Sequence, residues 1–239
     1  MSIKLSTSIG FISNIIIILL ISLSVISCKD NSPNQNEVES DSELETKADD
    51  SSTKKDKKVI LCFGNSLTAG YGLDDETTWW TSLLQERIDS MGYNYTVVNA
   101  GLSGETTSGG LQRISWALNQ QVDIFILELG ANDMLRGLAV DNTRENLEKI
   151  IISVREKNKD ISVIVAGMMA PPNMGKDYEN AFNNIYPFLT KKYDATLIPF
   201  FLDGVALDAD LNLPDGKHPN AEGQKIVLEN VWKAIESQL

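Results

Sequence analysis

The residues of this chain that could do chemistry are a serine and a histidine. Its single histidine, His218, lies in the segment 215–220, and Ser66 stands far upstream between Gly64 and Gly70, directly after an apolar run. A serine hydroxyl becomes an effective nucleophile only when a neighbouring base takes its proton. If Ser66 is a nucleophile, that base must be His218, because the chain has no other histidine.

The elements that could position these residues follow in a regular order. Short apolar runs alternate with stretches whose apolar residues recur at helical spacing. Strands are expected over residues 59–63, 95–99, 122–129, 161–167 and 196–200. Helices are expected over residues 79–91, 111–119, 143–158, 177–192 and 221–238. Asp141 or Asn142 should cap the third helix, and Pro187 should kink or interrupt the fourth.

This alternation predicts an α/β fold, a three-layer α/β/α sandwich around a five-stranded parallel sheet. In such sheets ligands bind outside the carboxyl ends of the strands. Ser66 follows the first expected strand, Gly101 the second and Asn132 the third. Periodicity does not require this agreement, so it indicates a shared site.

Four short blocks contain these residues. They are Gly64-Asn65-Ser66-Leu67-Thr68-Ala69-Gly70, Asn99-Ala100-Gly101-Leu102-Ser103-Gly104-Glu105-Thr106-Thr107, Gly130-Ala131-Asn132-Asp133 and Asp215-Gly216-Lys217-His218-Pro219-Asn220. In this order and spacing they resemble the GDSL or SGNH hydrolase family over residues 59–239. The similarity is closest to the bacterial branch of thioesterase I, lysophospholipase and arylesterase. The resemblance implies the flavodoxin-like fold of that family.

The resemblance implies a catalytic triad. Ser66 would be the nucleophile, although a serine is also a common helix N-cap. His218 would be the general base and then the general acid toward the leaving group. Asp215, three residues earlier, can hold one imidazole nitrogen and stabilise the imidazolium. An aspartate in a Pro-Asp-Gly loop is also typical of a turn, and both roles are compatible.

The resemblance also implies an oxyanion hole. A developing alkoxide needs fixed donors at about 3 Å, and we expect them to be the backbone N–H of Ser66 together with Gly101 and Asn132. Read in isolation, Gly101 is a tight-turn glycine and Asn132 a turn asparagine. Asp133 should structure its loop rather than take part in the chemistry.

Asn65 is the one departure from the family pattern, which has an aspartate at this position. The position is not part of the family's triad, and asparagine keeps the shape and the turn-forming ability of aspartate. We therefore expect full activity despite the change.

The expected activity is that of a serine esterase that acts through an acyl-enzyme intermediate. Its substrates would be small-molecule aryl or acyl esters, and the resemblance extends them to thioesters and lysophospholipids. No metal or organic cofactor is needed. Some apolar residues after the strands could line an acyl pocket or belong to the core, namely Leu102, Met134, Leu135 and Met169.

Two other functions fit the same scaffold. The family also contains carbohydrate O-deacetylases, which would need aromatic sugar contacts. Trp79, Trp80 and Trp116 are candidates for them, but their helical placement favours core packing. A non-catalytic binding lipoprotein would be expected to lose the serine, the histidine or the oxyanion asparagine, and all three are present.

The N-terminal segment is typical of a bacterial lipoprotein signal peptide. Lys4 precedes the apolar residues 12–26, which are few for a bilayer-spanning helix, since such a helix needs about 20. Cys28 follows where a cleavage site is expected, so residues 1–28 would form a lipoprotein signal peptide whose cleavage leaves a lipidated Cys28 as the new N-terminus. An uncleaved N-terminal anchor is the alternative. Both place the enzyme in the cell envelope, periplasmic or at the cell surface, with the membrane as a partner only through this anchor.

Residues 29–57 are polar and acidic. Val38 and Leu44 are their only larger aliphatic residues, so this segment cannot bury enough apolar surface to fold and should be a disordered tether. Residues 58–239 would then form the hydrolase domain, since that length is enough for one domain with a proper core.

Charge and cysteine content exclude several partners. The net charge of −12 argues against nucleic acid, whose phosphates need a basic surface. Cys28 and Cys62 are the only cysteines, so neither a disulfide framework nor a cysteine-based metal site follows. A single histidine excludes a histidine-rich metal site. We expect a monomer.

Overall fold

Five parallel strands form one sheet in the computed structural model, which describes residues 56–239. The predicted α/β fold with a five-stranded parallel sheet is confirmed. The strands are β1 (Lys58–Gly64), β2 (Tyr95–Gly101), β3 (Ile124–Glu128), β4 (Ser162–Ala166) and β5 (Thr196–Ile198). Their order across the sheet is β2-β1-β3-β4-β5.

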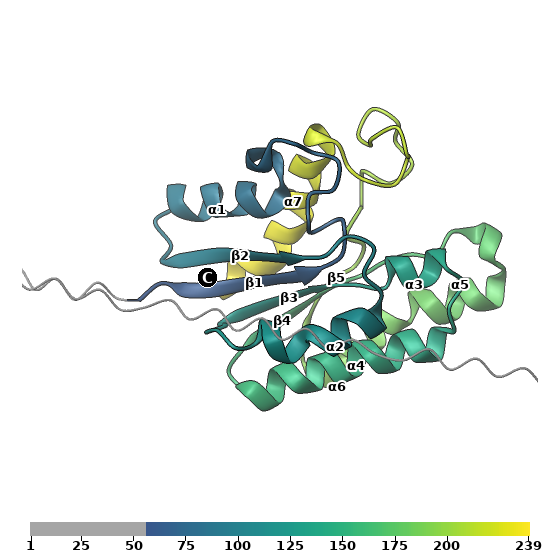
Figure 1. The fold of residues 1–239 in the computed structure, drawn as a ribbon, viewed down its shortest axis with the longest axis horizontal. Coiled ribbons are helices and arrows are strands. Elements are labelled where there is room, and N and C mark those ends of the chain that lie inside the picture. The colour runs from purple at the N-terminus through teal and green to yellow at the C-terminus, as the bar shows by residue number, and fades with distance from the viewer. Residues whose placement is uncertain (1–55) are drawn as a thin grey trace, which may run out of the picture. The chain divides into compact units, whose positions relative to one another are not determined.

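Helices cover both faces of the sheet and give three layers, with α1 and α7 on one face and α2, α4 and α6 on the other (Figure 1). The helices are α1 (Trp80–Ser90), α2 (Thr107–Ala117), α3 (Ala131–Leu135), α4 (Val140–Lys157), α5 (Lys176–Asn183), α6 (Ile185–Tyr193) and α7 (Ala221–Ile235). Short 3-10 turns are η1 (Glu76–Thr78), η2 (Pro172–Met174) and η3 (Glu236–Gln238).

The central strands are apolar along their length because helices bury both of their faces. All five residues of β3 are buried, and so are the last five residues of β1. Cys62 lies in β1 as a free, buried cysteine, and burial raises the pKa of its thiol. A thiol held protonated in this way is a poor nucleophile.

The two edge strands differ in how their outer backbone groups are covered. On β2, the side chain of Gln85 from α1 donates to the Tyr95 carbonyl at 3.2 Å and accepts from the Val97 N–H at 2.7 Å. β5 has three residues and ends before Pro199, which has no N–H to offer.

Two predicted helix starts are wrong. α2 begins at Thr107 rather than at residue 111, because Thr106 caps it by accepting a hydrogen bond from the Gly109 N–H. α4 begins at Val140, and its N-cap is Ala139, which makes no side-chain cap. The predicted caps Asp141 and Asn142 instead lie inside the first turn of α4.

Pro187 interrupts the predicted helix over residues 177–192, but the break lies before the proline. α5 ends at Asn183 and α6 begins at Ile185. Proline has no N–H for the carbonyl four residues earlier, which is that of Asn183, and its ring crowds that carbonyl. The chain therefore turns at Asn184, and Pro187 lies in the first turn of α6, where it is tolerated.

The remaining differences concern strand length and one tryptophan. The strand expected to span residues 196–200 stops at Ile198, because Pro199 ends it. The strand expected to span residues 122–129 is shorter, Ile124–Glu128. Trp80 is fully buried as expected. The prediction that Trp116 packs in the core is wrong, because 70% of this residue is exposed.

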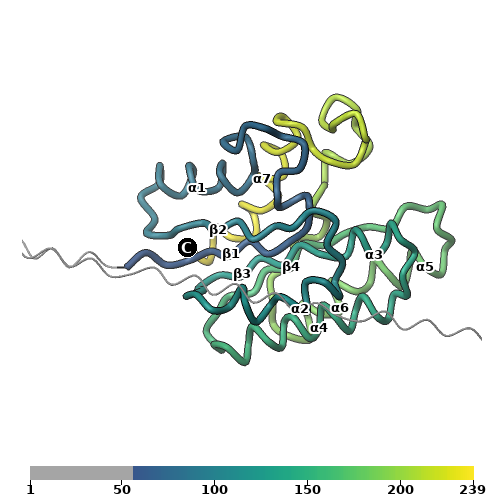
Figure 2. The backbone as a smooth tube through the Cα atoms, viewed as in Figure 1, coloured from purple at the N-terminus to yellow at the C-terminus, as the bar shows by residue number. Residues whose placement is uncertain are grey.

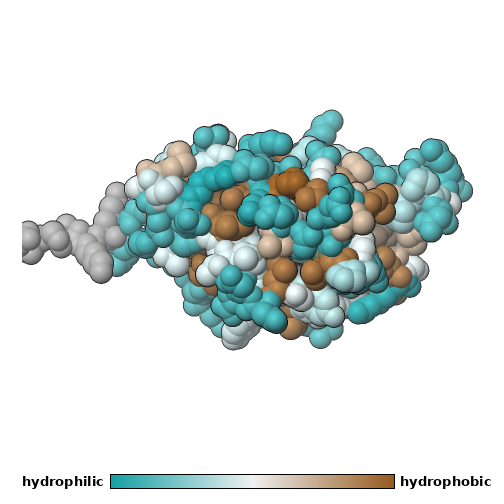
Figure 3. Space-filling view, turned by 90° about the horizontal axis from the view of Figure 1, so that it is seen from above, coloured by the Kyte–Doolittle hydropathy of each residue, from teal (hydrophilic) through white to brown (hydrophobic). Residues whose placement is uncertain are grey.

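The surface offers no continuous apolar face in the view from above. Hydrophobic side chains there lie in separate patches between hydrophilic ones (Figure 3). Within residues 56–239, no helix combines the length and the apolarity that crossing a bilayer would require.

Candidate active site

The structure brings Ser66, His218 and Asp215 together. The Ser66 hydroxyl oxygen lies 2.8 Å from His218 Nε2, and His218 Nδ1 lies 2.5 Å from Asp215 Oδ2. Ser66 follows the carboxyl end of β1, and the other two residues lie on the long connection from β5 to α7, which the backbone trace shows (Figure 2).

Asp215 also builds the turn that carries the histidine. Its Oδ1 accepts hydrogen bonds from the backbone N–H groups of Lys217, at 2.9 Å, and of His218, at 3.1 Å. The two interpretations of this aspartate from the sequence, turn former and imidazole partner, therefore coexist. Desolvation raises the pKa of Asp215, but the hydrogen bonds from His218 and Lys217 outweigh it and lower the pKa to about 2.

This geometry suits proton transfer from the serine. When the Asp215 carboxylate accepts a hydrogen bond from the Nδ1–H, the neutral imidazole presents Nε2 as an acceptor toward the Ser66 hydroxyl. Tyr71, which the sequence analysis did not single out, lies against the imidazole with 4.5 Å between the ring centroids. Its ring is half exposed, so it forms part of the wall beside the histidine.

Ser66 lies in a turn that buried side chains hold from behind. Asn65 Oδ1 accepts from the Leu67 N–H at 3.0 Å and lies 3.3 Å from the Ser66 hydroxyl. Asn65 itself contacts Glu128, the last residue of β3, which is fully buried. A Cβ at Gly64 would collide with Thr68 Oγ1 and with the Glu128 carboxyl group, so this position needs glycine.

Gly101 does not occupy the place that the oxyanion prediction requires. Its N–H donates to the side-chain Oδ1 of Asn99 at 2.9 Å. The next residue, Leu102, donates its N–H to Gly64 of β1, and backbone groups alternate in direction along a strand. The Gly101 N–H therefore points away from β1 and from Ser66. A Cβ here would collide with the backbone of Ala69, so close packing explains this glycine.

Gly104, three residues further on, is free to donate. It has a φ of +80°, and its N–H makes no hydrogen bond to any residue between 56 and 239. Asn132 lies in the first turn of α3, and its Nδ2 donates to the carbonyl of Glu105 at 3.0 Å. This bond uses one hydrogen of the amide and leaves the other available. Gly104 and the Asn132 amide therefore lie on adjoining segments.

Arg113 of α2 ties the loop after β2 to the end of β1. Its Nη2 donates to the carbonyl of Ala100 at 2.9 Å and to the carbonyl of Gly64 at 3.3 Å. The guanidinium also pairs with Glu105 and lies over the ring of Phe63, 3.9 Å from its centroid. Asp133 is buried and accepts from the N–H and the hydroxyl of Thr107, so it structures its loop as predicted.

The four apolar residues considered for an acyl pocket separate into two groups. Met134 is buried and belongs to the core, whereas Leu102, Leu135 and Met169 are about half exposed, at 54%, 58% and 49%. Leu102 follows β2 and Leu135 ends α3, the helix that carries Asn132.

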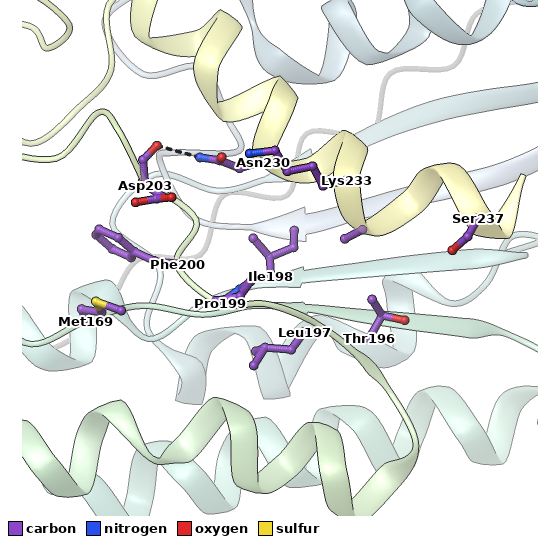
Figure 4. A pocket seen from close by; sticks show the side chains of 11 residues that line it. Met169, Thr196, Leu197, Ile198, Pro199, Phe200, Asp203, Asn230, Lys233 and Ser237 are labelled. Atoms are coloured by element: carbon purple, nitrogen blue, oxygen red, sulfur yellow. Dashed lines mark hydrogen bonds between the residues drawn. The ribbon is translucent and has the colours of Figure 1, made fainter.

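Met169 lines a separate cavity of about 590 Å³ beside β5 and α7 (Figure 4). Phe200, Asp203, Asn230 and Lys233 also line it, and the Asn230 amide donates to the Asp203 carbonyl at 2.8 Å. None of the lining residues is Ser66, Asp215 or His218. Because β3 and β4 lie between β1 and β5 in the sheet, this cavity is set apart from the serine.

Some predicted features lie outside the described residues. These are Cys28, the signal peptide over residues 1–28 and the tether except for residues 56 and 57. Within the described part of the chain, no group of three or more histidine, cysteine, aspartate or glutamate side chains is placed to hold a metal ion.

Comparison with known proteins now identifies the family. Residues 62–226 match the model of the GDSL-like Lipase/Acylhydrolase family, and the chain belongs to that family, as the four blocks predicted. It is 37% identical over 183 residues to esterase TesA of Pseudomonas aeruginosa, covering 76% of this chain and 90% of the relative. It is 36% identical over 181 residues to thioesterase 1/protease 1/lysophospholipase L1 of Escherichia coli, covering 75% and 83%.

A solved structure shares both the fold and the sequence similarity. AlinE4, described as an SGNH-hydrolase family esterase, has a TM-score of 0.63 and 42% identity, covering 77% of this chain and 97% of that one. The similarity thus extends over nearly the whole of the relative and over most of the residues that the structure describes.

Proposed function

We propose that this chain hydrolyses carboxylic esters, including aryl, acyl and thioesters, through an acyl-enzyme on Ser66. The observation that carries the proposal is the 2.8 Å contact between the Ser66 hydroxyl and His218 Nε2, with Asp215 at the other imidazole nitrogen. The relatives named as esterase, thioesterase and lysophospholipase support the substrate class.

In the proposed reaction His218 takes the proton of Ser66 as the hydroxyl oxygen attacks the ester carbonyl. The imidazolium then gives that proton to the departing alcohol or thiol. His218 then deprotonates a water molecule, which attacks the acyl-serine, and the acid leaves as the imidazolium returns the proton to the Ser66 oxygen. Asp215 stays ionised throughout, because its low pKa keeps it a carboxylate, and it stabilises the imidazolium that forms at each step.

The oxyanion would be held by the backbone N–H groups of Ser66 and Gly104 and by the Asn132 amide. Gly104 replaces Gly101 in this role, since the Gly101 N–H is already engaged by Asn99. A phosphonate that reacts with Ser66 mimics the tetrahedral intermediate, so its oxygen should shift the Gly104 amide proton resonance downfield and leave that of Gly101 nearly unchanged. A shift of the Gly101 resonance with the Gly104 resonance unchanged would instead indicate that Gly101 is the oxyanion donor.

The surroundings of the serine favour an apolar acyl or aryl group. Tyr71, Leu102 and Leu135 are all about half exposed, and they lie on the segments that carry Ser66, Gly104 and Asn132. The deacetylase alternative gains no support from the tryptophans. Trp80 is buried, Trp79 uses its indole N–H on the Leu73 carbonyl, and Trp116 lies at the far end of α2 from the site.

The test compares the purified wild-type chain with Ser66→Ala on p-nitrophenyl esters from acetate to palmitate. The variant should lose activity by more than about a thousandfold, and a matched change of a partly exposed serine on α4, Ser153→Ala, should leave the activity unchanged. Activity that survives in Ser66→Ala would refute the mechanism. A preference for acetate alone would favour the deacetylase.

We further propose that lipid on Cys28 anchors the domain at a membrane, with residues 29–57 as the tether. The support is the sequence alone, an apolar segment that ends at a cysteine. Bacteria expressing the full chain should incorporate radiolabelled palmitate into it, and Cys28→Ser should abolish this while Cys62→Ser should not. Labelling that persists in Cys28→Ser would contradict the anchor.

A further inference from the structure

Glu128 has no part in the chemistry described so far, yet it lies behind the nucleophile. It is the last residue of β3, fully buried, and it makes no ion pair with any residue from 56 to 239. A buried carboxyl group is costly unless hydrogen bonds satisfy it. Its partners therefore indicate what it does.

All its side-chain partners lie in the turn that carries Ser66. Oε2 accepts from the Asn65 N–H at 3.1 Å and lies 2.8 Å from Thr68 Oγ1, while Oε1 accepts from Asn65 Nδ2 at 2.7 Å. Glu128 thus contacts the residue before the serine and the second residue after it. Two of these contacts hold Asn65, one through its backbone and one through its amide.

Asn65 transmits this constraint to the serine. With Nδ2 held by Glu128, Oδ1 points back to the turn, where it accepts from the Leu67 N–H and lies 3.3 Å from the Ser66 hydroxyl. The hydroxyl has one proton and two acceptors nearby, since His218 Nε2 lies closer, at 2.8 Å.

We propose that Glu128 is a positioning residue for Ser66, and that Asn65 is the matched donor that couples the buried carboxyl group to the nucleophile turn. This inference rests on the proposed function. It also gives a physical meaning to the asparagine in the signature block, because an aspartate at position 65 would place two carboxyl groups in contact, and they would need to share a proton.

The Asn65 contacts do not depend on the protonation state of Glu128. A proton on Oε2 can be donated to Thr68 Oγ1, and both oxygens still accept from Asn65. Tyr186 of α6, Asp133 of α3 and Tyr178 of α5 are the other titratable groups in the surroundings of Glu128 and Tyr186. Burial, followed by the charges of Glu128, Asp133 and Tyr178, raises the pKa of Tyr186 well above its ordinary value, so its hydroxyl stays neutral.

A reciprocal exchange of donor and acceptor tests the proposal. In Glu128→Gln, either orientation of the amide sets an NH₂ group against one of the two Asn65 donors. In Asn65→Asp with Glu128→Gln, the Gln NH₂ donates to the new carboxylate, and the Gln oxygen accepts from the backbone N–H of residue 65. The double variant therefore restores the pairing with its direction reversed.

The expected result for Glu128→Gln is a fall in kcat on the order of 10- to 100-fold with KM within about twofold, the scale of a misplaced reacting group. The double variant should return to within about fivefold of wild type, because the two changes compensate. Relative to wild type at each pH, Asn65→Asp alone should lose kcat as the pH rises, when the shared proton leaves. Glu156→Gln, an exposed change on α4, is the matched control.

Wild-type kcat in Glu128→Gln would overturn the proposal, and so would a double variant no better than that single one. If Glu128→Gln fails to fold, the decision rests on the double variant, which must be folded and active, and on the alkaline loss in Asn65→Asp. The proposed function fails separately, if wild type is inactive or Ser66→Ala is active, because every comparison here is made relative to wild type.

Discussion

Arg113 donates two hydrogen bonds to Glu105, from Nε to Oε1 at 2.6 Å and from Nη2 to Oε2 at 2.5 Å. The carboxylate is nearly inaccessible, with 3% of its side chain exposed. This ion pair fixes the loop after β2. The backbone carbonyl of Glu105 in the same loop accepts a hydrogen bond from the Asn132 amide. The geometry of the proposed oxyanion site therefore depends on this buried ion pair.

Removing the arginine should cost stability because it strands the buried carboxylate. We expect Arg113→Met to lower the free energy of unfolding by about 3 kcal/mol, the usual scale for a broken buried pair. Lys225→Met removes one partner of an exposed pair with Glu222 and should cost less than about 1 kcal/mol. Urea unfolding followed by circular dichroism measures both, and equal losses would contradict the role of burial.

Asp215→Asn should leave the fold intact and remove most of the activity. The amide still fits the turn but can favour the wrong imidazole tautomer, so kcat should fall on the order of 10³- to 10⁴-fold. Asp160→Asn, which changes an exposed aspartate outside the site, should behave as wild type. Steady-state kinetics on p-nitrophenyl butyrate gives the answer, and a loss under tenfold would place the aspartate outside the mechanism.

Asn132→Ala removes one proposed oxyanion donor. We expect kcat to fall about 100- to 1000-fold with KM nearly unchanged, because the donor acts mainly in the transition state. Asn142→Ala, on the exposed face of α4, controls for the loss of an amide. A variant in which KM rises while kcat is kept would indicate that Asn132 binds the ground state instead.

The stability of the fold should depend on pH through Glu128. Burial raises its pKa from 4.5 to about 8, although hydrogen bonds from Thr68 and Asn65 oppose the rise. Between these values the unfolded chain has lost the proton that the folded chain keeps, so the free energy of unfolding should fall as pH rises from about 4.5 to about 8. Urea unfolding at several pH values should show this decline in wild type relative to Glu128→Gln. Parallel curves for the two proteins would exclude it.

Local signals in the sequence predicted the sheet, and the resemblance to the hydrolase family predicted that Ser66, Asp215 and His218 act together. Apolar runs mark buried strands, and a lone histidine leaves no choice of base. Gly101 shows where such reasoning stops. A glycine after a strand is compatible with an oxyanion donor, but only the alternation of backbone direction along β2 shows that its N–H points outward. Gly104 lacked a signal of its own, because an unbonded N–H is visible only in three dimensions.

Glu128 had a signal that the sequence analysis did not use. A glutamate that ends the run Ile124–Glu128 breaks an otherwise apolar strand, and a charged residue within such a run needs a partner or a function. The predicted starts of α2 and α4 were wrong for a different reason. These helices begin after the N-cap residues Thr106 and Ala139. Neighbouring polar residues look equally suitable as N-caps in the sequence, so the sequence alone does not select the right one.

A parallel sheet has two free edges, and in this protein both are partly blocked against pairing with another strand. The Gln85 side chain engages the Tyr95 carbonyl and the Val97 N–H, and the Asn99 side chain engages the Gly101 N–H. At the opposite edge, three residues and a proline leave too little backbone to template a neighbour. If many copies are crowded on one membrane, as lipid anchoring would arrange, these edges protect the folded molecules from joining sheet to sheet into aggregates.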